Sequence, residues 1–172
     1  LSFGFADGRY LAVSVEVRKE KGESFGIAKG FTNGYEIMYV AGDERDLIKL
    51  RTDYRLDDVY VYPTRATPEQ AREMLLSVAA RMNQLAKQPE FYNTLANNCT
   101  SNIVDHINQL HPGRVPIDYR TLLPGYSAEL AYDLGMLVDY GTFEETTRRA
   151  RINSLAYQAF DRTDFSQAIR RR

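Results

Sequence analysis

The 172-residue chain has the composition of an ordinary globular protein, with 44% hydrophobic and 26% charged residues. This length fits one domain with enough residues for a hydrophobic core. A formal net charge of −1 argues against a dedicated nucleic-acid surface. No apolar run approaches the roughly 18 residues of a membrane-spanning helix. The single cysteine cannot form an internal disulfide, so it does not indicate a redox compartment.

Alternating apolar residues predict β-structure in the first third of the chain. The pattern predicts strands over 1–5, 10–17, 35–40, 47–51 and 59–62, with a turn at 6–8, a loop over 19–30 and a solvated polar turn at 43–46. The chain begins Leu1-Ser2-Phe3-Gly4-Phe5, inside an apolar alternation and without an initiator Met. Because natural termini are usually frayed and polar, we expect a piece of a longer polypeptide.

Helical patterns follow. Thr67-Pro68-Glu69-Gln70 forms a capping box, so a helix begins there, and Pro89 closes it. A second helix begins near Cys99 and ends at His111, and a third covers 127–134. Strands first and helices afterwards predict an α+β fold. We expect one domain over 1–140, lacking its N-terminal edge, and a helical extension of it over 141–172, whose arginines form a solvated face or contact anionic lipid.

Cys99 lies where a polar loop turns into an apolar helix. Asn97, Asn98, Thr100 and Ser101 are residue types that cap helices, and apolar residues follow at helical spacing. The unpaired N–H groups and positive dipole end of a first helical turn stabilise a thiolate, which is the reactive form of cysteine. Cys99 is therefore a candidate nucleophile. The alternative is a buried cysteine that acts as a small apolar filler.

A thiolate nucleophile normally requires a histidine as general base. His106 lies seven residues past Cys99, about 10 Å along a continuous helix, which is too far for a Cys–His hydrogen bond of about 3 Å. His111 lies at the helix end, where a cation caps the last carbonyls. The spacing of the two histidines is not the i, i+4 spacing of a helical metal pair. The sequence therefore predicts no metal site and no cofactor.

Several stretches of the chain resemble the Lnb N-terminal periplasmic domain family. They are Leu1-Ser2-Phe3-Gly4-Phe5, Ser14-Val15-Glu16-Val17-Arg18, Tyr35-Glu36-Ile37-Met38-Tyr39-Val40, Gly42-Asp43-Glu44-Arg45-Asp46-Leu47, Phe91-Tyr92-Asn93-Thr94-Leu95, Asn97-Asn98-Cys99-Thr100, Leu123-Pro124-Gly125-Tyr126 and Asp164-Phe165-Ser166. The Asn-Asn-Cys block with Phe-Tyr-Asn-Thr ahead of it is the most specific, and the strand matches fall in the right order.

The resemblance implies a papain-like core of the permuted NlpC/P60 kind, with an N-terminal antiparallel sheet packed on C-terminal helices that include the Cys99 helix. Cys99 maps onto the nucleophile, and the base histidine is expected just upstream of Leu1. Glu16 is the best match for the residue that orients this histidine, or else a solvent-facing strand carboxylate. Asn98 either donates to an oxyanion or only caps the helix.

The resemblance also implies a function. We expect a cysteine-dependent acyl-transfer domain of the bacterial envelope that forms an acyl-enzyme on Cys99. It would act as a lipoprotein N-acyltransferase or as an amidase, on a phospholipid or on a lipoprotein or peptide. The alternative is a non-catalytic envelope module that keeps the fold and binds a partner. The expected location is the periplasm, with membrane tethering through segments outside this chain. No nucleic-acid partner is expected, and the oligomeric state stays open.

Overall fold

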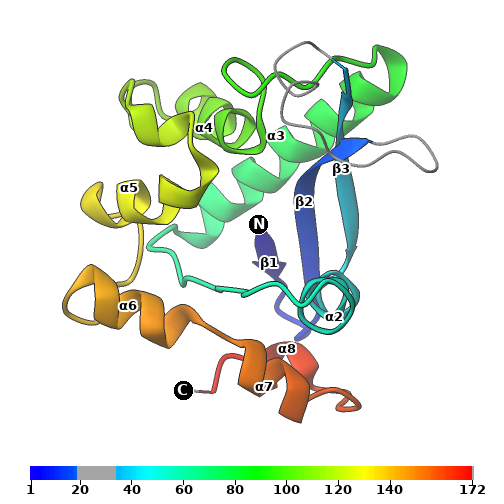
Figure 1. Cartoon of the computed structure of the whole chain (residues 1–172), viewed down its shortest axis with the longest axis vertical. Coiled ribbons are helices and arrows are strands. Elements are labelled where there is room, and N and C mark those ends of the chain that lie inside the picture. The colour runs from blue at the N-terminus through cyan, green and yellow to red at the C-terminus, as the bar shows by residue number, and fades with distance from the viewer. Residues whose placement is uncertain (19–33, 172) are drawn as a thin grey trace. The chain divides into compact units, whose positions relative to one another are not determined.

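A computed structural model describes residues 1–18 and 34–171, so the predicted loop over 19–30 lies outside the described residues. The fold is α+β, as predicted, with a three-stranded antiparallel sheet and several helices (Figure 1). The strands are β1 (Ser2–Gly4), β2 (Tyr10–Arg18) and β3 (Glu36–Asp43). The helices are α2 (Glu44–Lys49), α3 (Pro68–Lys87), α4 (Cys99–Leu110), α5 (Ser127–Asp133), α6 (Phe143–Ala150), α7 (Asn153–Gln158) and α8 (Phe165–Ala168). A π-helical turn, η1 (Leu50–Tyr54), and two 3₁₀ turns, η2 (Tyr119–Thr121) and η3 (Pro124–Tyr126), complete the order.

The sheet has the order β1-β2-β3. β1 and β2 are antiparallel, with Ser2 opposite Ala12 and Gly4 opposite Tyr10. The turn between them contains Gly8 at a φ of 82°, a conformation that favours glycine. This is the hairpin that the alternation over 1–5 and 10–17 predicts.

The strand predicted over 47–51 is wrong, because β3 runs directly into α2 and then into η1. Asp43 explains the switch: its carboxylate accepts from the Arg45 N–H at 2.9 Å and caps α2. A short apolar run such as Leu47-Ile48 does not distinguish a strand from a buried helix turn. The segment predicted as a strand over 59–62 makes only isolated bridges, such as Tyr60 with Arg151, and forms no strand.

The chain divides into two compact units. Unit 1 contains Leu1–Ser14, Ala41–Arg65 and Gly135–Arg172, and unit 2 contains Val15–Val40 and Ala66–Leu134. The core of unit 1 is built largely from the C-terminal segment, which supplies five buried apolar residues that pack with Ile48 of α2: Ile152, Ala156, Ala159, Phe165 and Ile169. In unit 2, Tyr35, Ile37, Leu85 and Tyr92 pack with Val15 and Val17.

A buried ion pair joins α2 to the end of the chain inside unit 1. Glu44 is 1% exposed, and both of its oxygens accept from Arg170, at 2.6 and 2.7 Å. Ser2 also donates to Glu44, and Arg170 lies over the Tyr10 ring. Burial alone raises the pKa of Glu44, but the hydrogen bonds from Arg170 and Ser2 hold it below its usual value. The prediction of a solvated turn at 43–46 is therefore wrong at Glu44.

Other arginines of the C-terminal segment form surface pairs. Arg162 and Arg171 both contact Asp164, at 2.8 and 3.0 Å, and Arg151 contacts Asp58. Exposed pairs of this kind are worth about 1 kcal/mol or less.

Glu44→Ala would leave the half-buried Arg170 without its carboxylate partner. We expect a loss of about 3 kcal/mol in the free energy of unfolding, because removing one member strands the other charge. Asp58→Ala, which breaks the exposed pair with Arg151, serves as the control and should cost less than about 1 kcal/mol. Equal losses in the two variants, measured by urea unfolding, would contradict the assignment of Glu44 as a buried anchor.

Candidate functional site

Cys99 is the first residue of α4, as the sequence predicts. Asn98 is the N-cap and is completely buried. Its side-chain oxygen accepts from the N–H groups of Thr100 and Ser101, both at 2.8 Å, and the Ser101 hydroxyl accepts from the Asn98 N–H at 2.9 Å. This capping box fixes the backbone on both sides of Cys99.

The loop before Cys99 is held to β3 by hydrogen bonds. The Ile37 N–H donates to the Glu90 carbonyl at 2.9 Å, and the Tyr92 N–H donates to the Tyr35 carbonyl at 2.7 Å. Within the loop, the Asn98 side-chain amide donates to the Thr94 carbonyl at 2.8 Å. Cys99 therefore follows a well-braced loop in unit 2.

Burial raises the pKa of the Cys99 thiol above its ordinary value. The side chain and N–H of Thr100 and the N–H of Cys99 itself act in the opposite direction but do not outweigh burial, and Glu16 adds to the increase. None of these leading causes of the shift is a cation. A helix N-terminus alone would lower the pKa of the thiol, but at Cys99 burial outweighs this effect.

Glu16 lies on β2, half-buried, in the same unit as Cys99. Its carboxylate is close enough to Cys99 to act on the thiol electrostatically. Tyr92 is a second neighbour of the thiol, because Cys99 contributes, after burial, to the raised pKa of this tyrosine. The structure thus brings Glu16 and Cys99 into one neighbourhood, and the orienting role of Glu16 stays a prediction.

Asn98 uses both polar atoms of its side chain inside the loop. The oxygen caps α4 and the nitrogen donates to Thr94. This geometry is that of a helix cap, which is one of the two predicted roles.

His106 and His111 take structural positions. His106 is 4% exposed, with Nε2 at 3.0 Å from the Tyr39 hydroxyl and Nδ1 at 2.8 Å from the Ser77 hydroxyl. His111 is the C-cap of α4, where its N–H donates to the Ile107 carbonyl at 2.8 Å. Neither arrangement places an imidazole beside the thiol.

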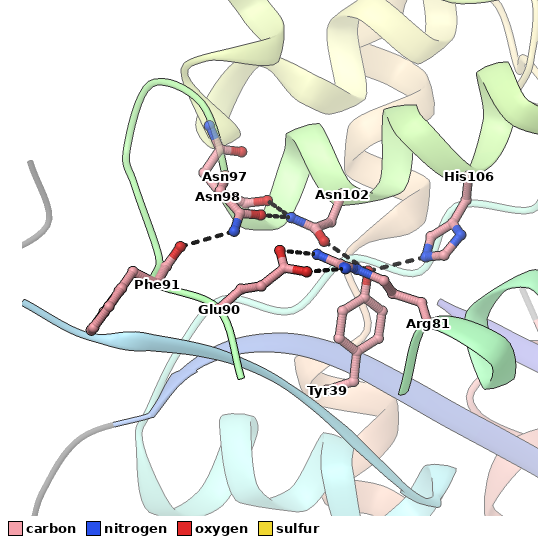
Figure 2. Close-up of polar contacts among 8 residues, drawn as sticks. All are labelled: Tyr39, Arg81, Glu90, Phe91, Asn97, Asn98, Asn102 and His106. Carbon is pink, nitrogen blue, oxygen red and sulfur yellow. Dashed lines mark hydrogen bonds and ion pairs between the residues drawn. The ribbon is translucent and has the colours of Figure 1, made fainter. Parts of the chain in front are cut away.

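A polar network that the sequence analysis missed connects β3, α3 and α4 (Figure 2). Asn102, 3% exposed, donates to the Asn97 side chain at 2.7 Å and to the Asn98 carbonyl at 2.9 Å, and accepts from the Tyr39 hydroxyl at 3.2 Å. Asn102 and His106 are four residues apart, which places both side chains on one face of α4, and this spacing of two polar residues is the signal that could have revealed the network.

An ion pair and a cavity border this network. Arg81 of α3 forms two hydrogen bonds with Glu90, at 2.6 and 2.7 Å (Figure 2). A polar cavity of about 390 Å³ opens between α3 and α4 and is lined by Ser77, Ala80, Arg81, Gln84, Asn102, Asp105, His106 and Gln109.

Residues 1–125 match the sequence profile of the Lnb N-terminal periplasmic domain. The chain belongs to the Lnb N-terminal periplasmic domain family. The match contains the sheet, α3, the braced loop and α4 with Cys99. No curated protein and no solved structure matches the chain.

The family description fits a periplasmic location. Within residues 1–18 and 34–171, no helix has both the length and the apolar character needed to cross a bilayer. The same described residues contain no group of histidine, cysteine and acidic side chains that could hold a metal ion.

His106 makes the stability of this Lnb-family chain pH-dependent. Burial and, to a smaller degree, the nearby Arg81 lower the pKa of His106 below its unfolded value of about 6.5. In the window between the two values the unfolded chain binds a proton that the folded chain does not, so stability falls as the pH decreases below about 6.5. His106→Gln should flatten this dependence in urea unfolding measured from pH 7.5 down to 5. An unchanged slope would contradict the neutral, buried imidazole.

Proposed function

We propose that this chain is the thiol domain of an envelope acyltransferase or amidase, with Cys99 as the nucleophile and a permuted papain-like arrangement of the core. The observation that carries the proposal is the position of Cys99 directly after a buried, fully hydrogen-bonded cap, at the start of a helix within the region that matches a periplasmic family. Bracing of the backbone on both sides of Cys99 supports the fixed attack geometry that a nucleophile requires.

The chemistry has two steps. The Cys99 thiolate attacks the carbonyl carbon of an acyl ester, and the carbon–oxygen bond breaks as the leaving alcohol takes a proton from the general base. An amine then attacks the thioester, the carbon–sulfur bond breaks, and the amine gives its proton to the base. If water takes the place of the amine, the outcome is hydrolysis. The Cys99 N–H, at the first position of α4, is the proposed oxyanion donor.

The proposed base is a histidine on the N-terminal side of Leu1, as the family resemblance implies. The Val13 N–H donates to the Leu1 carbonyl at 2.9 Å, which continues the β1–β2 ladder. In this register the residue directly preceding Leu1 would lie opposite Ser14 of β2. Glu16 would orient the imidazole, and the imidazolium would supply the cation that lowers the thiol pKa.

The proposed acyl donor is a phospholipid and the proposed acceptor is the amino terminus of a lipoprotein. A peptide amide is the alternative substrate. Tethering to the membrane through other segments of the protein would bring the domain to the lipid surface.

Cys99→Ala tests the assignment directly. We expect turnover by the natural full-length protein to fall by at least about a thousandfold, because the acyl-enzyme cannot form. The midpoint of thermal unfolding should change little, since the half-buried thiol is replaced by a small apolar group. Retained turnover together with a large loss of stability would return Cys99 to a structural role.

One observation favours the non-catalytic binding module: burial raises the pKa of the Cys99 thiol. The pH dependence of iodoacetamide alkylation separates the two functions. In this chain we expect an apparent pKa above the free value of about 8.5, and a value well below it when the upstream segment is present. A thiol with the same high pKa in both forms would favour the binding module.

A further inference from the structure

We propose that Tyr39 and Asn102 are positioning residues for Cys99, because they terminate a one-directional chain of hydrogen bonds that begins on α3 and ends at the backbone preceding the cysteine. The proposal rests on the proposed function of Cys99 and adds the device that holds this residue in place. All members of this chain of hydrogen bonds lie in unit 2. Figure 2 shows them apart from Ser77.

Asn102 sets the direction of the chain. Its side-chain nitrogen faces two acceptors, the Asn97 side-chain oxygen at 2.7 Å and the Asn98 carbonyl at 2.9 Å. The side-chain oxygen of Asn102 must therefore face the Tyr39 hydroxyl, 3.2 Å away, and requires a donor there. Tyr39 has one hydroxyl proton, and this contact uses it.

The tautomer of His106 follows from this assignment. Since the Tyr39 proton points to Asn102, the tyrosine oxygen accepts from His106 Nε2–H at 3.0 Å. A neutral imidazole then has its lone pair on Nδ1, which accepts from the Ser77 hydroxyl at 2.8 Å. Every donor along the path points from α3 toward the start of α4, an arrangement in which each hydrogen bond strengthens the next.

The last hydrogen bonds of this series reach Cys99 through the backbone. Asn102 binds the Asn98 carbonyl, and this carbonyl belongs to the peptide group that supplies the Cys99 N–H. Asn97 carries the contact further, because its side-chain nitrogen donates to the Phe91 carbonyl at 2.8 Å. The positions of the thiol and of the proposed oxyanion donor therefore depend on a tyrosine sixty residues earlier in the sequence.

Tyr39→Phe and Asn102→Ala interrupt the chain of hydrogen bonds at two points. Each change leaves a buried polar group without its partner and loosens the first turn of α4. We expect the thiol to become more accessible, so that the apparent pKa from alkylation by iodoacetamide falls toward the free value of about 8.5. A fall of about half a pKa unit corresponds to a roughly threefold higher alkylation rate below the pKa.

Val78→Ala is the matched control. Val78 is completely buried on α3, next to Ser77, so its truncation destabilises the fold without touching the chain of hydrogen bonds. Alkylation of Cys99 is followed by intact mass in the 172-residue protein and its variants. The temperature is chosen so that the circular dichroism spectrum of every variant is that of the folded protein. Val78→Ala should lose stability but keep the same pH dependence of Cys99 alkylation as the unsubstituted protein.

An unchanged alkylation profile in Tyr39→Phe and Asn102→Ala, or an equal change in Val78→Ala, would overturn the positioning role. This readout does not depend on turnover. If Cys99 is not catalytic, the Cys99→Ala variant keeps its turnover. The alkylation profile of Cys99 in the Tyr39→Phe variant still changes in that case, because it reports on position and not on turnover. If only the positioning role fails, turnover still requires Cys99.

Discussion

The hydrogen bonding of Asn98 is the constraint on which the candidate site depends. This residue is completely buried, so each of its polar atoms needs a partner inside the protein. Its side chain caps α4 and closes the preceding loop onto Thr94, while its carbonyl accepts from Asn102. One polar system therefore links the start of α4 to the braced loop and to the polar network that connects β3, α3 and α4. Cys99 directly follows Asn98, which belongs to all three parts.

The electrostatics of Cys99 show why position alone does not make a reactive thiol. The helix start supplies N–H donors, but burial outweighs them and the neighbouring Glu16 carboxylate adds to the cost of a thiolate. A carboxylate beside a thiol favours the thiolate only if a cation lies between them, as in a Cys–His–acid arrangement. An activated thiol at this position would therefore require a cation such as the proposed histidine beside Cys99 and Glu16.

Features that depend on neighbouring residues were predictable from the sequence. The Thr67 and Asn98 caps, the Gly8 turn and the end of α4 at His111 all follow from signals within a few residues. The Glu44–Arg170 pair joins positions 126 residues apart, and Tyr39 meets His106 across 67 residues, so no local pattern contains them. The strand predicted over 47–51 failed because Asp43, read as part of a turn, is instead the cap of α2.

The most direct test of the account is the intact mass of the natural full-length protein after incubation with vesicles of a phospholipid with defined acyl chains, in the absence of an acceptor amine. The account predicts a mass increase of one acyl group, located on Cys99 by peptide mapping and removed by neutral hydroxylamine, as expected for a thioester. An acyl group on another residue, or turnover by Cys99→Ala without any adduct, would contradict the assignment of Cys99 as the nucleophile.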